Sequence, residues 1–156
     1  MIRTRLPLNF RTRAALILGT VLAAGALAAF ALRAADDSAQ HCFADDGEAA
    51  IAACTRAIDS GRFRGAELAA IYGNRAIELR QRGDYDRAIA DYSEAIRFDT
   101  GLVGAYAGRG LAYEGANDVE KAKSDYRKAL TLTSKYADRE WAQETARARL
   151  AALPES

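Results

Sequence analysis

The 156-residue sequence has little proline, cysteine or histidine, with 2, 2 and 1 of them respectively. So few prolines beside 50% hydrophobic residues exclude collagen-like, mucin-like and disordered chains. One pair of cysteines excludes a small protein held by several disulfides. The single histidine, His41, cannot complete a zinc ligand set with the cysteine beside it, and phosphate-binding glycine loops and nucleophile motifs are missing. We therefore expect no enzyme activity, no catalytic residues, no metal and no cofactor.

Acidic residues are missing from positions 1–35, where five arginines are the only charged side chains. Removing these five from the 22 basic residues leaves 17 basic against 21 acidic residues in 34–156, a net charge of −4. A surface that binds nucleic acid needs an excess of positive charge. We therefore exclude nucleic acid as a partner.

Residues 14–32 form a run of 19 residues without a charge, which would span about 28 Å as a helix, close to the thickness of a bilayer core. Because arginines precede this run, we expect residues 1–35 to be a signal peptide or an N-terminal membrane anchor. The length favours an anchor, whereas Ala29-Phe30-Ala31 offers a cleavage site; a buried core helix is the third alternative. The first two place residues 36–156 in the periplasm or another extracytoplasmic space, attached to the inner membrane if residues 14–32 stay uncleaved.

The body repeats every 34 residues. Arg75 returns as Arg109 and Tyr92 as Tyr126, and apolar residues fall at helical spacing in two runs per unit. Between the runs, Gly83 can take the left-handed conformation that ends a helix, and Asn117 holds the same place one unit later. The aspartates that follow them, Asp84 and Asp118, are expected to cap the next helices.

These residues resemble the tetratricopeptide repeat, with the family's large residue at position 4, small residues at 8, 20 and 27, and aromatic residue at 24. The usual proline at position 32 is replaced by Thr100 and Ser134. The resemblance implies an all-α solenoid of helical hairpins, about 2.5 repeats plus a C-terminal capping helix, after an N-terminal hydrophobic helix. Its parts would be a degenerate first repeat in 36–68, repeats in 69–102 and 103–136, and the capping helix in 137–156.

Both ends of the array depart from the repeat. Residues 50–58 match the second helix of a repeat at an offset of 38, so the first helix of that unit is confined to about Ser38–Ala44. At the other end, residues 138–153 predict one helix that Pro154 stops and that closes the solenoid. Its inward residues are expected to be Trp141, Ala142, Thr145, Leu150 and Leu153.

The two cysteines, Cys42 and Cys54, are 12 residues apart with a turn-forming segment between them. One continuous helix would hold them about 18 Å apart, too far to bond. A turn at residues 44–47 would instead fold Cys42 over Cys54. In an oxidising compartment we predict a disulfide, which would stabilise the weakest part of the array; a buried free thiol is the alternative.

The family resemblance implies a non-catalytic adaptor that binds a protein or peptide in the groove lined by its first helices. Carried over by register, that groove comprises Ala70, Gly73, Asn74, Ile77, Arg80, Gln81, Gly104, Ala107, Gly108, Leu111 and Glu114. The alternative is a structural or assembly subunit of an envelope complex whose groove is permanently filled. The subfamily that grips the C-terminal carboxylate of chaperones with lysines, an arginine and asparagines is not matched. Only Asn74 agrees with that set, and Gly104 and Gly108 stand where it needs basic side chains.

Two features of the groove region have competing explanations. Arg75 and Arg109 are expected to pair with acidic residues such as Asp91 and Asp125 inside each repeat rather than contact a ligand. Glycines within helices need compensation, since each costs up to about 1 kcal/mol relative to alanine. Gly110 has a packing role at position 8. For Gly104 and Gly108, ligand access and close helix packing both remain open.

Overall fold

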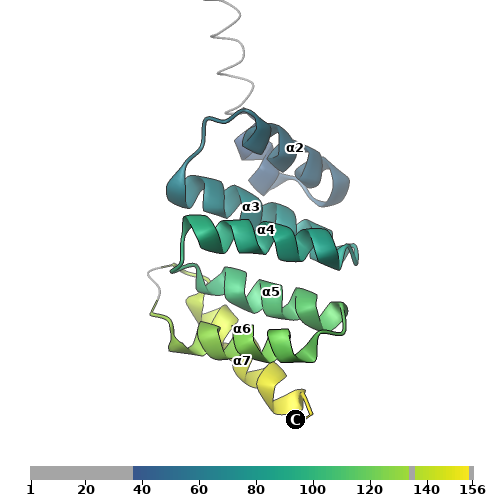
Figure 1. The fold of residues 1–156 in the computed structure, drawn as a ribbon. Coiled ribbons are helices and arrows are strands. Elements are labelled where there is room, and N and C mark those ends of the chain that lie inside the picture. The colour runs from purple at the N-terminus through teal and green to yellow at the C-terminus, as the bar shows by residue number, and fades with distance from the viewer. Residues whose placement is uncertain (1–36, 134–135, 155–156) are drawn as a thin grey trace, which may run out of the picture.

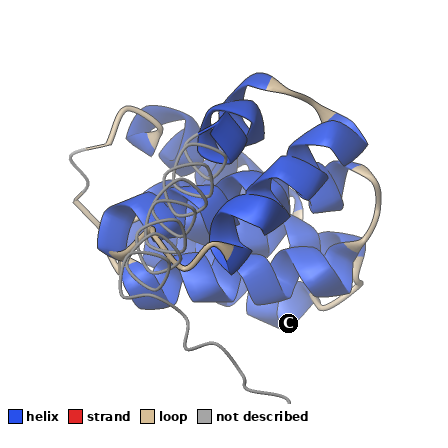
Figure 2. Ribbon diagram, turned by 90° about the horizontal axis from the view of Figure 1, so that it is seen from above, coloured by secondary structure: helices blue, strands red, loops and turns tan. Residues whose placement is uncertain are grey.

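The computed structural model describes residues 37–133 and 136–154. After a helical segment at residues 37–44, the elements are α2 (Gly47–Asp59), α3 (Gly65–Gln81), α4 (Tyr85–Phe98), α5 (Val103–Gly115), α6 (Val119–Thr131) and α7 (Arg139–Ala152). Within these described residues every regular element is helical, as Figure 2 shows. The all-α solenoid is confirmed. The predicted signal peptide or anchor and the hydrophobic helix in residues 1–35 lie outside the described part.

The helices stack in chain order as antiparallel hairpins, α3 with α4 and α5 with α6, and α7 closes the C-terminal end (Figure 1). Residues 37–44 and α2 form the hairpin at the other end. Among the residues described, no helix has both the length and the apolar composition needed to cross a membrane.

The two hairpin turns have the predicted left-handed residue, with φ of +81° at Gly83 and +62° at Asn117. Behind Gly83, the amide of Asp84 donates to the carbonyl of Leu79 at 2.9 Å, which ends α3 in a Schellman motif. Asp118 caps α6 by accepting from the Lys121 amide at 3.2 Å. The cap expected from Asp84 is wrong, because its carboxylate accepts from the Arg87 guanidinium at 3.0 Å instead of from the backbone.

Small residues let the helices of each hairpin approach closely around a buried tyrosine. Ala76, Ala88 and Ala95 are fully buried around Tyr92 in the first complete hairpin. In the next hairpin, a Cβ at Gly110 would lie 2.5 Å from the ring of Tyr126. This distance is shorter than any real contact, so the packing role of Gly110 is confirmed.

The capping helix α7 packs on α5 and α6 through Ala142 and Ala146, which are fully buried. Leu150 and Leu153 pack against the same cluster, as expected. Trp141 is 49% exposed, so its predicted inward position is wrong. Successive residues on a helix point about 100° apart, and the stripe set by the two alanines turns the neighbouring tryptophan outward.

At the N-terminal end, a disulfide joins Cys42 to Cys54, with a Cα–Cα distance of 4.6 Å, and both residues are fully buried. Residues 45–46 form the turn between the helical segment and α2. The extra residues of this unit lie in the loop of residues 60–64, from which Phe63 packs back against the disulfide cluster.

Candidate protein-binding surface

An identical ion-pair arrangement links each repeat to the one before it. Arg75 donates from Nε and Nη2 to both oxygens of Asp91, at 2.7 and 2.8 Å, and from Nη1 to the Thr55 hydroxyl of α2 at 2.9 Å. Arg109 makes the same three bonds, at the same distances, to Asp125 and to the Ser93 hydroxyl of α4. The predicted ion pairs are confirmed, and these arginines hold helices together rather than face a ligand.

The aspartates of these pairs are largely withdrawn from solvent, with 9% of the Asp91 side chain and 8% of the Asp125 side chain exposed. Hydrogen bonding to its aspartate raises the pKa of each arginine, Arg75 and Arg109, above the ordinary value, although burial opposes the shift. Bidentate geometry and a third bond to a hydroxyl satisfy the buried groups. Each ion pair therefore joins the two helices of one repeat, and the third bond joins that repeat to the one before it.

Position 6 of the first helices, predicted to line the groove, serves packing between repeats. A Cβ at Gly108 would lie 2.5 Å from the Tyr92 ring, so glycine is required there by close packing and not by ligand access. Asn74 holds the same position one repeat earlier, where the facing residue is the smaller Cys54. Its amide donates to the Cys42 carbonyl and lies 4.0 Å from the Cys54 sulfur. The structure therefore gives both Gly108 and Asn74 contacts between neighbouring hairpins.

The remaining α5 positions assigned to the groove are covered by α7. A Cβ at Gly104 would lie 2.0 Å from the Asp138 carboxylate, immediately before α7, so a larger residue at position 104 would require the Asp138 side chain to move. Ala107 is fully buried in the cluster that contains the α7 alanines, and Leu111 packs against it. Glu114 pairs with Arg149 of α7. The prediction that α5 lines an open groove is therefore corrected.

Glu114 is held by two partners. Arg149 donates to its carboxylate from Nε at 3.0 Å and from Nη2, and the Tyr126 hydroxyl donates to it as well. Hydrogen bonding to Arg149 lowers the pKa of Glu114, whereas burial and the bond to Glu114 raise the pKa of Tyr126. The guanidinium of α7 thus neutralises the carboxylate of α5 at position 12 of the repeat.

Arg80 holds position 12 in α3 and makes the equivalent contact with the opposite charge. Burial raises the pKa of Tyr92, and the nearby positive charge of Arg80 partly offsets this shift. Its Nε is buried and has no hydrogen-bond partner within the described residues. No carboxylate of those residues forms an ion pair with it, in contrast to Glu114.

The part of the predicted groove that stays open lies on α3. Ile77 is 38% exposed and Gln81 is exposed, Ala70 is half-buried and Gly73 is buried. Beside Ala70, an apolar pocket of about 300 Å³ opens between the helical segment 37–44, the loop before α3 and α3 itself. Its lining residues are Ala39, Phe43, Phe63, Glu67, Ala70 and Ile71.

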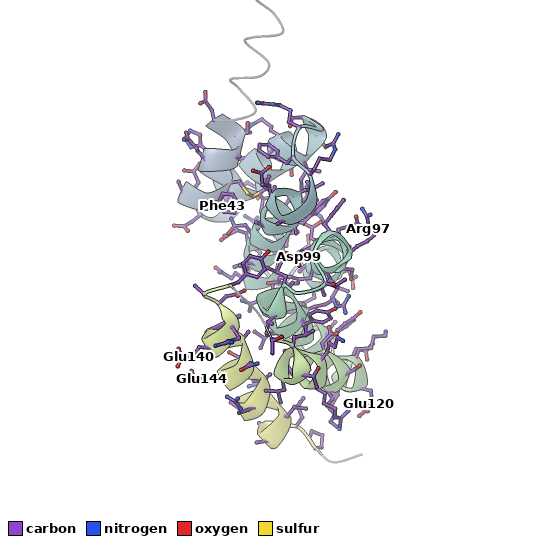
Figure 3. All side chains as sticks on the ribbon, turned by 90° about the vertical axis from the view of Figure 1, so that its left-hand side faces the viewer. Phe43, Arg97, Asp99, Glu120, Glu140 and Glu144 are labelled. Carbon is purple, nitrogen blue, oxygen red and sulfur yellow. A yellow bond between two sulfur atoms is a disulfide. The ribbon has the colours of Figure 1, made fainter. Side chains whose placement is uncertain are left out.

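Sequence reasoning missed Phe43, which is 55% exposed, and misplaced Trp141. Together with Ile77, these are the large hydrophobic side chains that the described residues leave exposed. All three belong to first helices of the array. Figure 3 shows Phe43 and the α7 residues Glu140 and Glu144 on one side of the molecule, with Arg97 and Glu120 of the second helices on the other. The repeat register could have placed Trp141 on this face, since it stands 34 residues after Ala107 of the predicted groove.

Within the described residues, no three or more His, Cys, Asp or Glu side chains gather where they could hold a metal ion. What the described surface offers is an apolar pocket, the exposed side chain of Ile77 on α3 and an arginine, Arg80, without an ion-pair partner among the described residues.

Two family models match the chain, one described as TPR repeat over residues 77–117 and one as tetratricopeptide repeat over residues 103–136. The comparison with curated proteins found no match. Among solved structures, the Arabidopsis OM64 TPR domain is similar with a TM-score of 0.61 at 24% identity, covering 76% of this chain and 98% of that one.

The first TPR domain of human RPAP3 is similar with a TM-score of 0.56 at 21% identity, covering 78% of this chain and 93% of that one. The Hsp90 co-chaperone Cns1 from Saccharomyces cerevisiae has a TM-score of 0.61 at 18% identity, over 79% of this chain and 40% of that one. At these identities the likeness shows the fold alone. The family models therefore match residues 77–136, and the described helices have a solenoid fold similar to that of these TPR domains.

Proposed function

We propose that this protein is a non-catalytic interaction module that binds a segment of another protein on the face formed by its first helices. The observation that carries the proposal is the apolar pocket beside Ala70, together with the exposed side chain of Ile77 seven residues further along α3. Concave, mostly apolar sites with a few polar groups are the usual form of a binding site. Such exposed apolar area on a small chain marks an interaction surface.

Filling the pocket tests this function. Ala70→Trp places an indole at the pocket wall, and Ala90→Trp adds the same side chain at an exposed position of the second helix α4. With the full chain as bait in an envelope extract, we expect Ala70→Trp to lose the partners that wild type and Ala90→Trp retain. Both variants must melt within a few degrees of wild type. Unchanged capture by a folded Ala70→Trp variant would exclude this face as the binding site.

The site of action that we propose is outside the cytoplasm. Supporting this are the arginines before the uncharged run of residues 14–32, which orient such segments, and the disulfide between Cys42 and Cys54, since disulfides persist in oxidising compartments. A phosphatase reporter fused after Ser156 is expected to be active. Activity of a cytoplasm-dependent reporter at that position would exclude the location. The size of the mature chain in membrane and soluble fractions distinguishes an uncleaved anchor in residues 14–32 from a signal peptide.

The second candidate is an assembly subunit whose groove is permanently filled. It is favoured by α7, which already covers the α5 part of the predicted groove in the free chain. Sedimentation of the full chain over a concentration series separates the two. An adaptor gives a stable monomer at the lowest concentrations, whereas an obligate assembly subunit does not.

A further inference from the structure

We propose that the partner segment carries a carboxylate that binds Arg80, four or five residues away from an apolar side chain that fills the pocket beside Ala70. The inference rests on the proposed function and specifies its ligand.

The first step is the comparison of position 12 in the two complete repeats. At Glu114 this position has a hydroxyl partner from Tyr126 and a charged partner, Arg149, from the next helix. At Arg80 the ring of Tyr92 holds the equivalent place, but no carboxylate of the described residues forms an ion pair with the guanidinium. Its Nε is buried, whereas the residue as a whole is half-buried, so the outer nitrogens are the atoms that a ligand can reach. A carboxylate from outside the chain would supply the charged partner that Arg149 supplies to Glu114.

The second step concerns which anion fits. The site offers a single guanidinium, and the molecule itself shows the matching partner, because Glu114 and Arg149 form a bidentate carboxylate–guanidinium pair at the equivalent position. The wall of the pocket includes Glu67, and residues 34–156 have a net charge of −4. A strongly acidic segment would be repelled. The complementary ligand therefore has one carboxylate beside apolar residues.

The third step sets the spacing. Ala70 and Arg80 lie ten residues apart on α3, or about 15 Å along the helix axis at 1.5 Å per residue. An extended chain advances about 3.3 Å per residue, so four to five residues cover that distance. Between the two points Ile77 is 38% exposed and shares the stripe of Ala70, seven residues before it. A second apolar side chain of the ligand would lie there.

The test is a selection from a random library of 12-residue peptides against the full chain, purified in detergent and immobilised through a tag after Ser156. From wild type we expect peptides with an apolar residue and an Asp or Glu four or five residues apart. Replacing that acid by its amide should weaken binding about tenfold to wild type, and less than twofold to Arg80→Gln.

The decisive variant reverses the charge. Arg80→Glu is expected to select peptides with Lys or Arg in place of the acid. The variant should fold, because glutamate already holds this position in the next repeat and accepts from Tyr126. Arg127→Glu, on the second helix α6, makes the same change of charge away from the face and should select the same peptides as wild type. Thermal melts verify that all variants fold.

The outcomes separate this inference from the proposed function. The role of Arg80 is wrong if Arg80→Glu still selects acidic peptides. It is also wrong if wild type selects peptides without an acid and Ala70→Trp abolishes that selection. In both cases the pocket beside Ala70 remains the proposed binding site. If Ala70→Trp selects the same peptides as wild type, the pocket is not the site and both proposals fail. Failure of wild type to enrich any peptide also counts against both.

Discussion

Replacing Gly108 by alanine tests directly why a helix-breaking residue stands in the middle of α5. In an open groove, the substitution would relieve the low helix propensity of glycine and stabilise the protein by about 1 kcal/mol. The structure predicts the opposite. The new Cβ would lie 2.5 Å from Cζ, 2.6 Å from the hydroxyl oxygen and 2.7 Å from Cε1 of Tyr92.

The magnitude follows from two opposing contributions. Overpacking of a tight core costs about 1–3 kcal/mol, and the gain in propensity returns about 1 kcal/mol. Tyr92 is 2% exposed and cannot swing into solvent without loss of its own packing. We therefore expect Gly108→Ala to lower the free energy of unfolding by up to about 2 kcal/mol. Combined with Tyr92→Ala, the same change should raise it by about 1 kcal/mol, because the overlap is gone.

The assay is urea unfolding followed by circular dichroism at 222 nm, for wild type, both single variants and the double variant. The coupling free energy between positions 108 and 92 should equal the overlap contribution, about 1–3 kcal/mol. A stabilising Gly108→Ala in the wild-type background, or additivity of the two changes, would refute the packing account and return Gly108 to the ligand surface.

The other predictions concern two ion pairs and the disulfide that join the helices. Arg109→Met leaves the carboxylate of Asp125 buried and unpaired, so the free energy of unfolding should fall by about 3–5 kcal/mol. Adding Asp125→Leu removes the unpaired charge and should restore the stability. A loss below about 1 kcal/mol for Arg109→Met in urea unfolding would contradict this. Because bonding to Arg149 lowers the pKa of Glu114, the unfolded chain takes up a proton there first as the pH falls. The stabilisation by the Glu114–Arg149 ion pair is therefore complete above the ordinary pKa of 4.5 and is lost as the pH falls through the lowered pKa. Glu114→Gln should flatten that acidic part of the profile of melting temperature against pH. An unchanged profile would show that the ion pair is not its cause. Cys54→Ser removes the disulfide, which joins residues 12 apart, and should lower the free energy of unfolding by about 3 kcal/mol. Amide hydrogen exchange should accelerate first in residues 37–44. Uniform acceleration along the chain would show that the disulfide does not act locally.

The repeat and its turns were predictable because each depends on local sequence. Periodicity at 34 residues identified the hairpins, and Gly83 and Asn117 stand where only a few residues tolerate a positive φ. The pairing of Arg75 with Asp91 also followed from register, since residues 16 apart in one hairpin face each other across two antiparallel helices. These features need no knowledge of what lies beyond the hairpin.

The errors concern contacts between hairpins. Register assigned Gly104 and Glu114 to an open groove, whereas α7 covers them. The capping helix was predictable from the sequence, but the face of α5 on which it packs was not. Trp141 was expected to be buried because of its size, although the stripe of Ala142 and Ala146 decides which face of α7 is inward. Small residues carry the packing information in this chain, and hydrophobicity alone ranks them below tryptophan.

The contacts between hairpins also explain why the repeats are not interchangeable. Position 6 of each first helix faces position 24 of the preceding hairpin, and the sizes compensate along the array: Asn74 against Cys54 and Gly108 against Tyr92. With the units 69–102 and 103–136 exchanged, glycine would face Cys54 and leave a gap, and the amide of asparagine would take the place where glycine is needed beside a tyrosine. Both mismatches cost packing free energy, a cavity in one case and an overlap in the other. The order of the repeats is therefore fixed by complementary volumes, although their ion pairs are identical. The charged contacts differ in the same way, since α7 supplies Arg149 to Glu114 whereas no carboxylate of the described residues pairs with Arg80.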